Sequence, residues 1–455
     1  MQICICRVRV EELIDVRSLI SKIQSDKQEA IELGVLKKEK KLDDIHKNEI
    51  PYSLPDGWEW IRLGDYAFKI TDYVASGSFA SLKENVLITN EPNYAIMVKT
   101  ADFSNNFSKN LTYTDEHGYT FLSNSNLFGG ELILSNIGSI GKVFIVPNLG
   151  VPMTLASNTV MVKMSDKKLI KYLYYFFLSP LGQRTLKNIS SGTSMMKFNK
   201  TQLKNIIVPI APLKQQQNIV QLFDRLSILI ENQKTQLKLL DELVKARFVE
   251  MFGDPNIEFK YSSVKFNDLV VRMTKGPFGS DMKKDLFVPK GEDTYKVYIQ
   301  INAIQKNQSL GEYYISKEYF DRKVSRFELF PNDYIITCDG TLGKYLKLDE
   351  NMEKGVISPS LLRLTLQNDK INDKYFENIW DFYMLELMKK EARNACLVHL
   401  PSAKKIGEIS IPVPPLELQN QFASFVEEID KSRLRELLAI KHIKLLLNDS
   451  WLLFY

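Results

Sequence analysis

The sequence has few cysteines, and their scatter excludes two classes of protein. The 455 residues include only Cys4, Cys6, Cys338 and Cys396. Four cysteines are too few for a disulfide framework in a chain of this length. No pair of them has the spacing of a zinc site beside histidines. We therefore expect a protein of the reducing cytoplasm.

Long apolar runs are also missing. No run of about 18 or more apolar residues occurs, so no membrane-spanning helix is expected. Glycine and proline are scarce, at 21 and 17 residues, while 44% of the residues are hydrophobic and 25% are charged. That is the composition of a globular protein of two to four domains, at about 100 to 200 residues per domain. The net charge of +5 permits a polyanionic partner without requiring one.

Catalytic motifs are the third absence. The segments Gly138–Lys142 and Gly340–Lys344 are too short for a phosphate-binding loop, and we interpret them as turns between strands. The pair Pro414 and Pro415 lacks the preceding Asn or Asp and the following aromatic residue of a base methyltransferase loop. The four histidines form no metal or nucleophile motif. The residues therefore predict no catalytic site.

An internal repeat is the strongest positive signal. The Pro-rich segments Ile206–Gln216 and Ile409–Gln419 match at an offset of 203 residues. Ser135–Lys142 and Thr337–Lys344 match at an offset of 202 residues. Ordered matches at an almost constant offset indicate an internal duplication, so the chain is expected to have two similar halves.

Each Pro-rich segment is followed by an uninterrupted helical pattern of roughly 40 residues, or about 60 Å. Apolar residues recur in it with the heptad spacing of a coiled coil. Each helix is the obvious partner of the other, although each could instead pack on its own globular half. The predicted seam comprises Phe223, Leu226, Ile230, Leu237, Leu240 and Val244 in the first helix, and Val426, Ile429, Ile440, Ile443 and Leu447 in the second.

The remaining segments show mixed patterns. Short β-like runs are broken by Gly, Asn and Asp clusters and followed by helical patterns. The predicted fold class is α+β, with two globular α+β domains that alternate with two long helices in a pseudo-twofold internal repeat. The predicted parts are an exposed N-terminal helical arm (1–50), a first domain (51–211), a first helix (212–253), a second domain (254–413) and a second helix (414–455).

Two similar but unequal domains held apart by rigid helices suggest recognition of a two-part, asymmetric target. Symmetric dimers read palindromic DNA, because the symmetry of the protein mirrors that of the site. One chain with diverged halves is suited to two different half-sites. A helix of this length spans at most roughly 18 base pairs.

Specific segments then identify a family. They are Ile50–Asp65 with its Pro-Asp-Gly-Trp-Glu-Trp core, the Pro-rich starts of both long helices, the junction Glu250–Pro255, and the stretch Thr274–Ser280. With these segments the sequence, from about Glu11 onward, resembles the DNA-specificity (S) subunits of type I restriction-modification systems. The resemblance implies two target-recognition domains, each reading half of a split DNA sequence, and two helices packed antiparallel as a spacer.

The resemblance also implies the partners. They are double-stranded DNA, two methyltransferase (modification) subunits docked on the helices, and ATP-dependent restriction subunits that translocate DNA. The chain itself is expected to be non-catalytic and to bind no cofactor or metal, with S-adenosylmethionine, ATP and Mg²⁺ on the partner subunits. Two alternatives are a coiled-coil scaffold without DNA specificity and a stand-alone DNA-modifying enzyme.

Candidate DNA contacts are sought among Lys, Ser and Thr near Gly-containing loops, and among Gln and Asn as readers of adenine. For each residue the alternative is a solvated surface position. The candidates for phosphate and hydroxyl contacts are Lys142, Thr193, Ser194, Lys197, Thr274, Lys275, Ser280, Lys283, Lys284 and Lys344, and those for base reading are Gln300 and Asn302.

Overall fold

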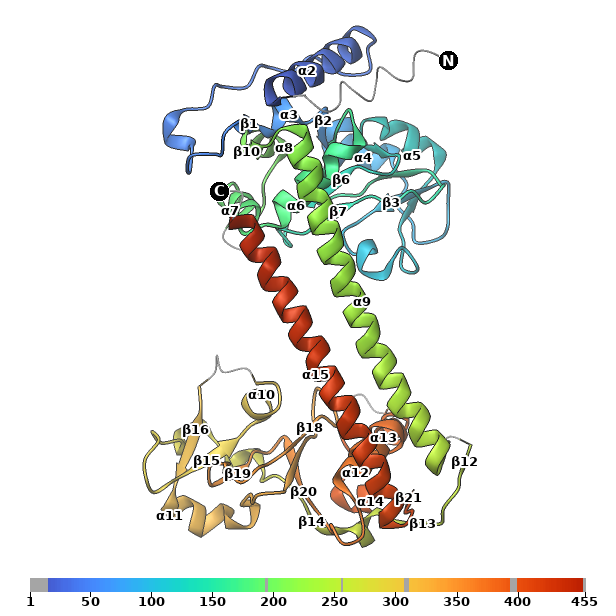
Figure 1. Cartoon of the computed structure of the whole chain (residues 1–455), viewed down its shortest axis with the longest axis vertical. Coiled ribbons are helices and arrows are strands. Elements are labelled where there is room, and N and C mark those ends of the chain that lie inside the picture. Colours follow the sequence, from blue (N-terminus) through green and yellow to red (C-terminus); the bar gives the residue numbers. More distant parts are fainter. Residues whose placement is uncertain (1–14, 193–194, 255–256, 307–310, 393–398, 453–455) are drawn as a thin grey trace. The chain divides into compact units, whose positions relative to one another are not determined.

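The computed structural model of the chain describes residues 15–192, 195–254, 257–306, 311–392 and 399–452 (Figure 1). The chain divides into two compact units. The first unit holds the residues up to Asn232 and those from Ala439 onward, and the second unit is Gln233–Leu438. Each unit therefore includes part of both long helices, and the predicted domain limits stay a prediction. No helix in the described ranges is both long and apolar enough to cross a bilayer.

The globular part of the first unit, here the first domain, contains two four-stranded sheets and a separate strand pair. The sheet orders are β2-β9-β6-β7 and β4-β3-β8-β5, and only β3 and β8 run parallel. The strands are β1 (Glu59–Arg62), β2 (Lys69–Asp72), β3 (Ala95–Val98), β4 (Tyr113–Thr114), β5 (Asn126–Leu127), β6 (Leu132–Ser135), β7 (Val143–Ile145), β8 (Met153–Leu155), β9 (Thr159–Lys163) and β10 (Ile207–Ile210). The helices are α2 (Val16–Glu32), α3 (Leu63–Tyr66), α4 (Phe79–Asn85), α5 (Glu116–Phe121), α6 (Ile170–Leu178), α7 (Pro180–Asn188) and α8 (Lys200–Asn205).

The second domain, the globular part of the second unit, repeats this topology except that its second sheet has three described strands instead of four. Its sheet orders are β14-β20-β17-β18 and β16-β15-β19, with β15 and β19 parallel, and β13 pairs with β21. The strands are β11 (Gly253–Asp254), β12 (Glu258–Phe259), β13 (Ser263–Lys265), β14 (Val270–Lys275), β15 (Thr294–Tyr298), β16 (Tyr313–Ser316), β17 (Tyr334–Thr337), β18 (Tyr345–Lys347), β19 (Gly355–Ile357), β20 (Leu361–Leu366) and β21 (Ser410–Pro412). The helices are α10 (Gln300–Ala303), α11 (Lys317–Tyr319), α12 (Asp373–Ile379), α13 (Leu385–Ala392) and α14 (Ala403–Gly407), with π-helical turns at η10 (Phe320–Val324) and η12 (Trp380–Met384).

Strand register confirms the internal repeat. Ile133 on β6 faces Met161 on β9, and Ile335 on β17 faces Arg363 on β20, so both partners shift by the same 202 residues. The central strands of each domain are buried runs rather than alternating ones, since helices and the second sheet cover their faces. The α+β class with two repeated domains is confirmed.

The two long helices are α9 (Leu213–Phe252) and α15 (Leu416–Leu452). The first part of α9 shares a unit with the last part of α15, and the second part of α9 shares a unit with the first part of α15. The helices are therefore antiparallel. An ion pair between Arg433 and Asp241, 2.7 Å apart, links them within the second unit.

The Pro-rich helix starts are built alike in both halves. Near α9, the Gln216 amide donates a hydrogen bond to the Ala211 carbonyl at 2.7 Å. Near α15, the Gln419 amide donates to the Pro414 carbonyl at 2.8 Å. Both glutamines are buried, so each satisfies a main-chain oxygen that water cannot reach. This role explains why Gln recurs four residues after the last proline of each segment.

The predicted seam residues lie on the covered face of each helix. In the first unit, Phe223, Ile230 and Ile440 are buried, and Leu226, Ile443 and Leu447 are half-buried. In the second unit, Val244, Val426 and Ile429 are buried, and Leu237 and Leu240 are half-buried. Whether each of these residues meets the opposite long helix stays a prediction.

The expectation of an exposed N-terminal helix is wrong for the part that the structure describes. Helix α2 buries Val16, Leu19 and Ile23 in the core of the first unit. These residues follow one another at intervals of three and four positions, so they share one face of the helix. The charged composition of the segment hid this apolar stripe.

The segment after α2 is fixed to the first domain by Arg62 on β1. Its guanidinium binds both carboxylate oxygens of Glu49, at 2.7 and 2.9 Å, and donates to the Asp43 carbonyl at 3.2 Å. The hydrogen bonds from Arg62 lower the pKa of Glu49 to about 2, so this carboxylate stays charged at neutral pH.

Candidate nucleic-acid interface

The first Gly-containing loop, residues 136–142, connects β6 to β7 as the sequence predicts. Gly141 has φ of 92°, which favours glycine, and a Cβ there would meet the Gln183 side-chain oxygen. The Gln183 amide donates to the Gly141 carbonyl at 2.9 Å. Helix α7 therefore braces the loop at its second glycine.

Three main-chain contacts, here called the loop frame, hold this loop against two other segments. Asn136 N donates to Asn158 O at 3.2 Å, and Phe198 N donates to Asn136 O at 3.0 Å. A β-bridge joins Ile137 to Lys197. The frame brings together the β6–β7 loop, the β8–β9 turn and the segment before α8, which are far apart in the sequence.

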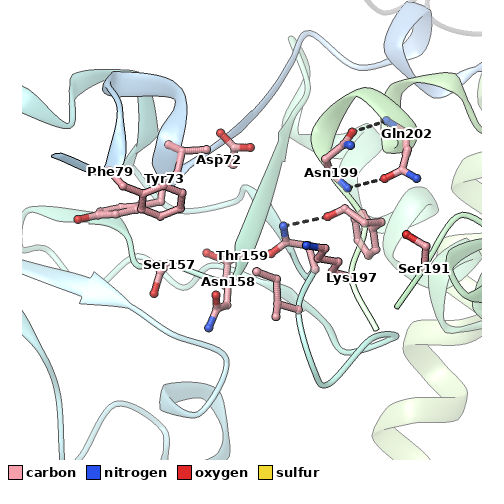
Figure 2. Close-up of a pocket in the computed structure, with 14 residues that line it drawn as sticks. Asp72, Tyr73, Phe79, Ser157, Asn158, Thr159, Ser191, Lys197, Asn199 and Gln202 are labelled. Atoms are coloured by element: carbon pink, nitrogen blue, oxygen red, sulfur yellow. Dashed lines mark hydrogen bonds between the residues drawn. The ribbon is translucent and has the colours of Figure 1, made fainter. Parts of the chain in front are cut away.

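A cavity of about 390 Å³ lies beside the loop frame of the first domain. The rings of Tyr73 and Phe79 lie on one side of it, with Asn199 and Gln202 on the other (Figure 2). Phe79 is 77% exposed. The other polar groups of the lining are Asp72, Asn136, Ser157, Asn158, Thr159, Ser191 and Lys197. An exposed ring beside many donors and acceptors suits a surface that binds nucleotide edges and phosphates.

The second domain has the same loop frame, displaced by 202 residues. Cys338 N donates to Ser360 O, and Leu400 N donates to Cys338 O, both at 2.8 Å. A β-bridge joins Asp339 to His399. The brace is also present, because Trp380 Nε1 donates to the Gly343 carbonyl at 2.9 Å.

Side chains on the two frames differ. The second frame has Asp339 where the first has Ile137, and Asp339 Oδ1 lies 2.5 Å from His399 Nδ1. His399 in turn takes the place of Lys197. The frames therefore offer the same backbone with different chemical groups.

In the first domain, the structure places two of the predicted contacts at the frame. Lys142 ends the Gly-containing loop and Lys197 belongs to the bridge, and both are exposed. Thr193 and Ser194 lie outside the described residues.

In the second domain, three predicted residues gather around the loop at 338–344. Lys344 is exposed at the end of this loop. The amide nitrogen of Gln300 lies 3.8 Å from the position that a Cβ on Gly340 would occupy. Burial raises the pKa of the Cys338 thiol to about 12, and the positive charge of Lys275 acts in the opposite direction by favouring the thiolate. The thiol is therefore neutral at pH 7, and Cys338 takes part in the frame through its main-chain atoms.

The other predicted residues are placed elsewhere in the second domain. Thr274 lies within β14, opposite Arg363. The amide of Asn302 donates to the Gly311 carbonyl. The exposed residues Ser280, Lys283 and Lys284 belong to a segment that Tyr319 fastens, through a 3.0 Å hydrogen bond to the Asp281 carbonyl.

The sequence interpretation missed Asn158, Asp339 and His399. Asp339 directly precedes one of the two matched Gly-Lys segments, and aligning the halves at 202 residues pairs Lys197 with His399. That alignment was the available signal. No group of three or more His, Cys, Asp or Glu side chains suited to a metal ion occurs in the described ranges.

Comparisons with known proteins agree with this architecture. The type I restriction modification DNA specificity domain matches residues 55–241 and 279–442. The type I restriction enzyme MjaVIII specificity subunit of Methanocaldococcus jannaschii is 22% identical over 427 residues, covering 86% of this chain and 90% of that protein. The EcoAI specificity subunit of Escherichia coli is 24% identical over 245 residues, covering 53% of this chain and 40% of that protein.

A solved structure has a similar fold. Its subject is complex assembly and conformational transition of the type I R-M system, and one of its chains matches with a TM-score of 0.56 at 15% identity. The match covers 88% of this chain and 97% of that chain. Because the domain match spans more than half of the sequence, this chain belongs to the family of type I restriction-modification specificity subunits.

Proposed function

We propose that this chain reads a bipartite, asymmetric DNA target, with one half-site for each domain. The observation that carries the proposal is the loop frame, which recurs with the same main-chain contacts and different side chains. Identical side chains on the two loop frames would favour a palindromic target, because contacts to bases determine which sequence is bound. Unequal side chains on equal frames suit two different half-sites.

We also propose that the long helices dock two methyltransferase subunits, with restriction subunits completing a larger assembly. Support comes from apolar side chains that the described chain leaves exposed on both helices, since such surface marks interaction sites. They are Leu222, Ile228, Leu229, Leu239 and Leu243 on α9, and Leu434, Leu437, Leu438, Leu445 and Leu446 on α15. In this proposal, S-adenosylmethionine, ATP and Mg²⁺ bind to the partner subunits and the chain itself is non-catalytic.

Methylation mapping tests the function. Methylated adenine would be mapped across the host genome with the gene intact and with this gene alone deleted. Loss of one asymmetric, two-part motif with a fixed gap is the expected result. An unchanged methylome in a host whose methyltransferase is active would contradict DNA reading and favour a scaffold. Methylation or cleavage of DNA by the purified chain alone would instead favour an enzyme.

Lys197 in the first loop frame and Lys142 at the end of the same loop are expected to contact phosphates. Lys142→Ala and Lys197→Ala should each weaken binding to matched and unmatched duplexes alike. Each should also reduce the slope of log K against log salt by about 0.9, because one fewer phosphate is neutralised. The assay is a salt titration of DNA binding by the full chain with its methyltransferase subunits.

Lys214→Ala is the matched control, since Lys214 is exposed at the start of α9. It should leave the salt slope unchanged. If all three variants and the unmodified protein have equal salt slopes, neither Lys142 nor Lys197 contacts a phosphate.

A further inference from the structure

We propose that Asp339 is a specificity-determining residue of the second domain, which accepts a hydrogen bond from the N4 amino group of a cytosine in the second half-site. His399 is the positioning residue that orients its carboxylate. The inference rests on the proposed DNA-reading function and deepens it by naming the residue and the base.

The pair has the geometry of an oriented acceptor. Asp339 Oδ1 lies 2.5 Å from His399 Nδ1, and because a carboxylate only accepts, the ring nitrogen carries the hydrogen. This contact leaves Asp339 Oδ2 without a partner in the described part of the chain. The side chains of Asp339 and His399 are 40% and 49% exposed, so a ligand can reach the pair.

The backbone beneath the pair is held in place. Cys338 is fully buried and exchanges main-chain hydrogen bonds with Ser360 and Leu400. The bridge between Asp339 and His399 fixes both residues. A carboxylate on such a frame needs little further ordering when it binds, which favours selectivity.

The charge of Asp339 argues for base contact rather than phosphate contact. A carboxylate repels phosphates, so a direct contact between this side chain and DNA requires a hydrogen-bond donor on a base. In the major groove, cytosine presents N4 as a donor, whereas adenine places the N7 acceptor beside its N6 donor. A lone carboxylate therefore prefers cytosine.

The neighbouring residues can supply the remaining contacts. Gln300 lies close to Gly340, and the Gln305 amide donates to the Thr341 hydroxyl at 3.4 Å. Lys344 closes the same loop with an exposed positive charge. The first domain has Ile137 and Lys197 at the positions of the pair, so its half-site provides an internal control.

Methylation mapping in cells that carry Asp339→Asn tests the inference. The substitution keeps the shape of the side chain and replaces one acceptor oxygen by a donor. We expect the preference for cytosine at one position of the second half-site to fall by about tenfold or more, with the first half-site and the gap unchanged. His399→Ala should relax the same position, and His399→Gln, which keeps a donor, should partly restore it.

Glu350→Gln is the matched control, because it removes one exposed carboxylate at the opposite end of the β17–β18 hairpin. If the methylated DNA motif in cells that carry Asp339→Asn is identical to that of the unmodified protein, the inference is overturned. Loss of all methylation at a normal level of the chain would also overturn it, since it would assign Asp339 a structural role. If deletion of the gene leaves the methylome unchanged, the proposed function itself fails.

Discussion

Replacement of Phe248 by alanine is expected to lower the free energy of unfolding by about 3 to 5 kcal/mol, the usual cost of emptying a buried aromatic site. Phe248 is fully buried near the end of α9. Its ring contacts Phe252, Tyr375, Phe382 and Phe422, with centroids 5.1 to 5.7 Å away. The substitution therefore removes the residue that joins α9, α12, η12 and the start of α15.

Denaturant unfolding followed by circular dichroism measures this loss, with hydrogen exchange showing whether it falls in the second unit. Leu243→Ala is the control, because Leu243 lies on the same helix but is 47% exposed. Its substitution should change the free energy of unfolding by about 0.5 kcal/mol or less. Similar small changes for both variants would show that the aromatic cluster does not stabilise the second unit.

The double variant Leu237→Glu with Leu240→Glu is expected to abolish assembly with the methyltransferase subunits. Both leucines are half-buried, and Leu240 packs against the core of the second unit. Burying two carboxylates there costs several kcal/mol, so the helices should separate locally. Light scattering after size exclusion would then report the free subunits instead of the complex.

A control with the same change in net charge is Lys245→Glu, at an exposed position of the same helix that lies about 120° or more around the helix axis from Leu239 and Leu243. This variant should assemble normally. A complex of unchanged mass with Leu237→Glu and Leu240→Glu would reject the seam as the basis of the docking surface.

The sequence was sufficient for the large-scale architecture, because duplication leaves a signal in offsets alone. The match between Ser135–Lys142 and Thr337–Lys344 placed two loops that the structure shows on the same strand connections. The burial of helix α2 is harder to predict from the sequence. Its three core residues are few among many charged ones, and only the tertiary structure shows that they pack against a core.

The candidate site was only partly accessible to sequence reasoning. Residue type favours Lys142 and Lys197, and the structure places Lys197 in the first loop frame and Lys142 at the end of the loop that this frame holds. Asp339 and His399 are 60 positions apart, and only a β-bridge reveals that they pair. The amide of Asn302 predicts a base contact, but its nitrogen donates to the Gly311 carbonyl. Pairings of this kind depend on tertiary contacts that local patterns do not encode.

The loop frame has a consequence for how this protein can change over generations. Its hydrogen bonds run between main-chain atoms, so they form equally well with Ile137 or Asp339, and with Lys197 or His399, in place. Substitution at these positions therefore leaves the support of the loop intact while altering the groups it displays. The two loop frames already carry different side chains on the same backbone. A new DNA preference therefore needs only a few substitutions on either frame.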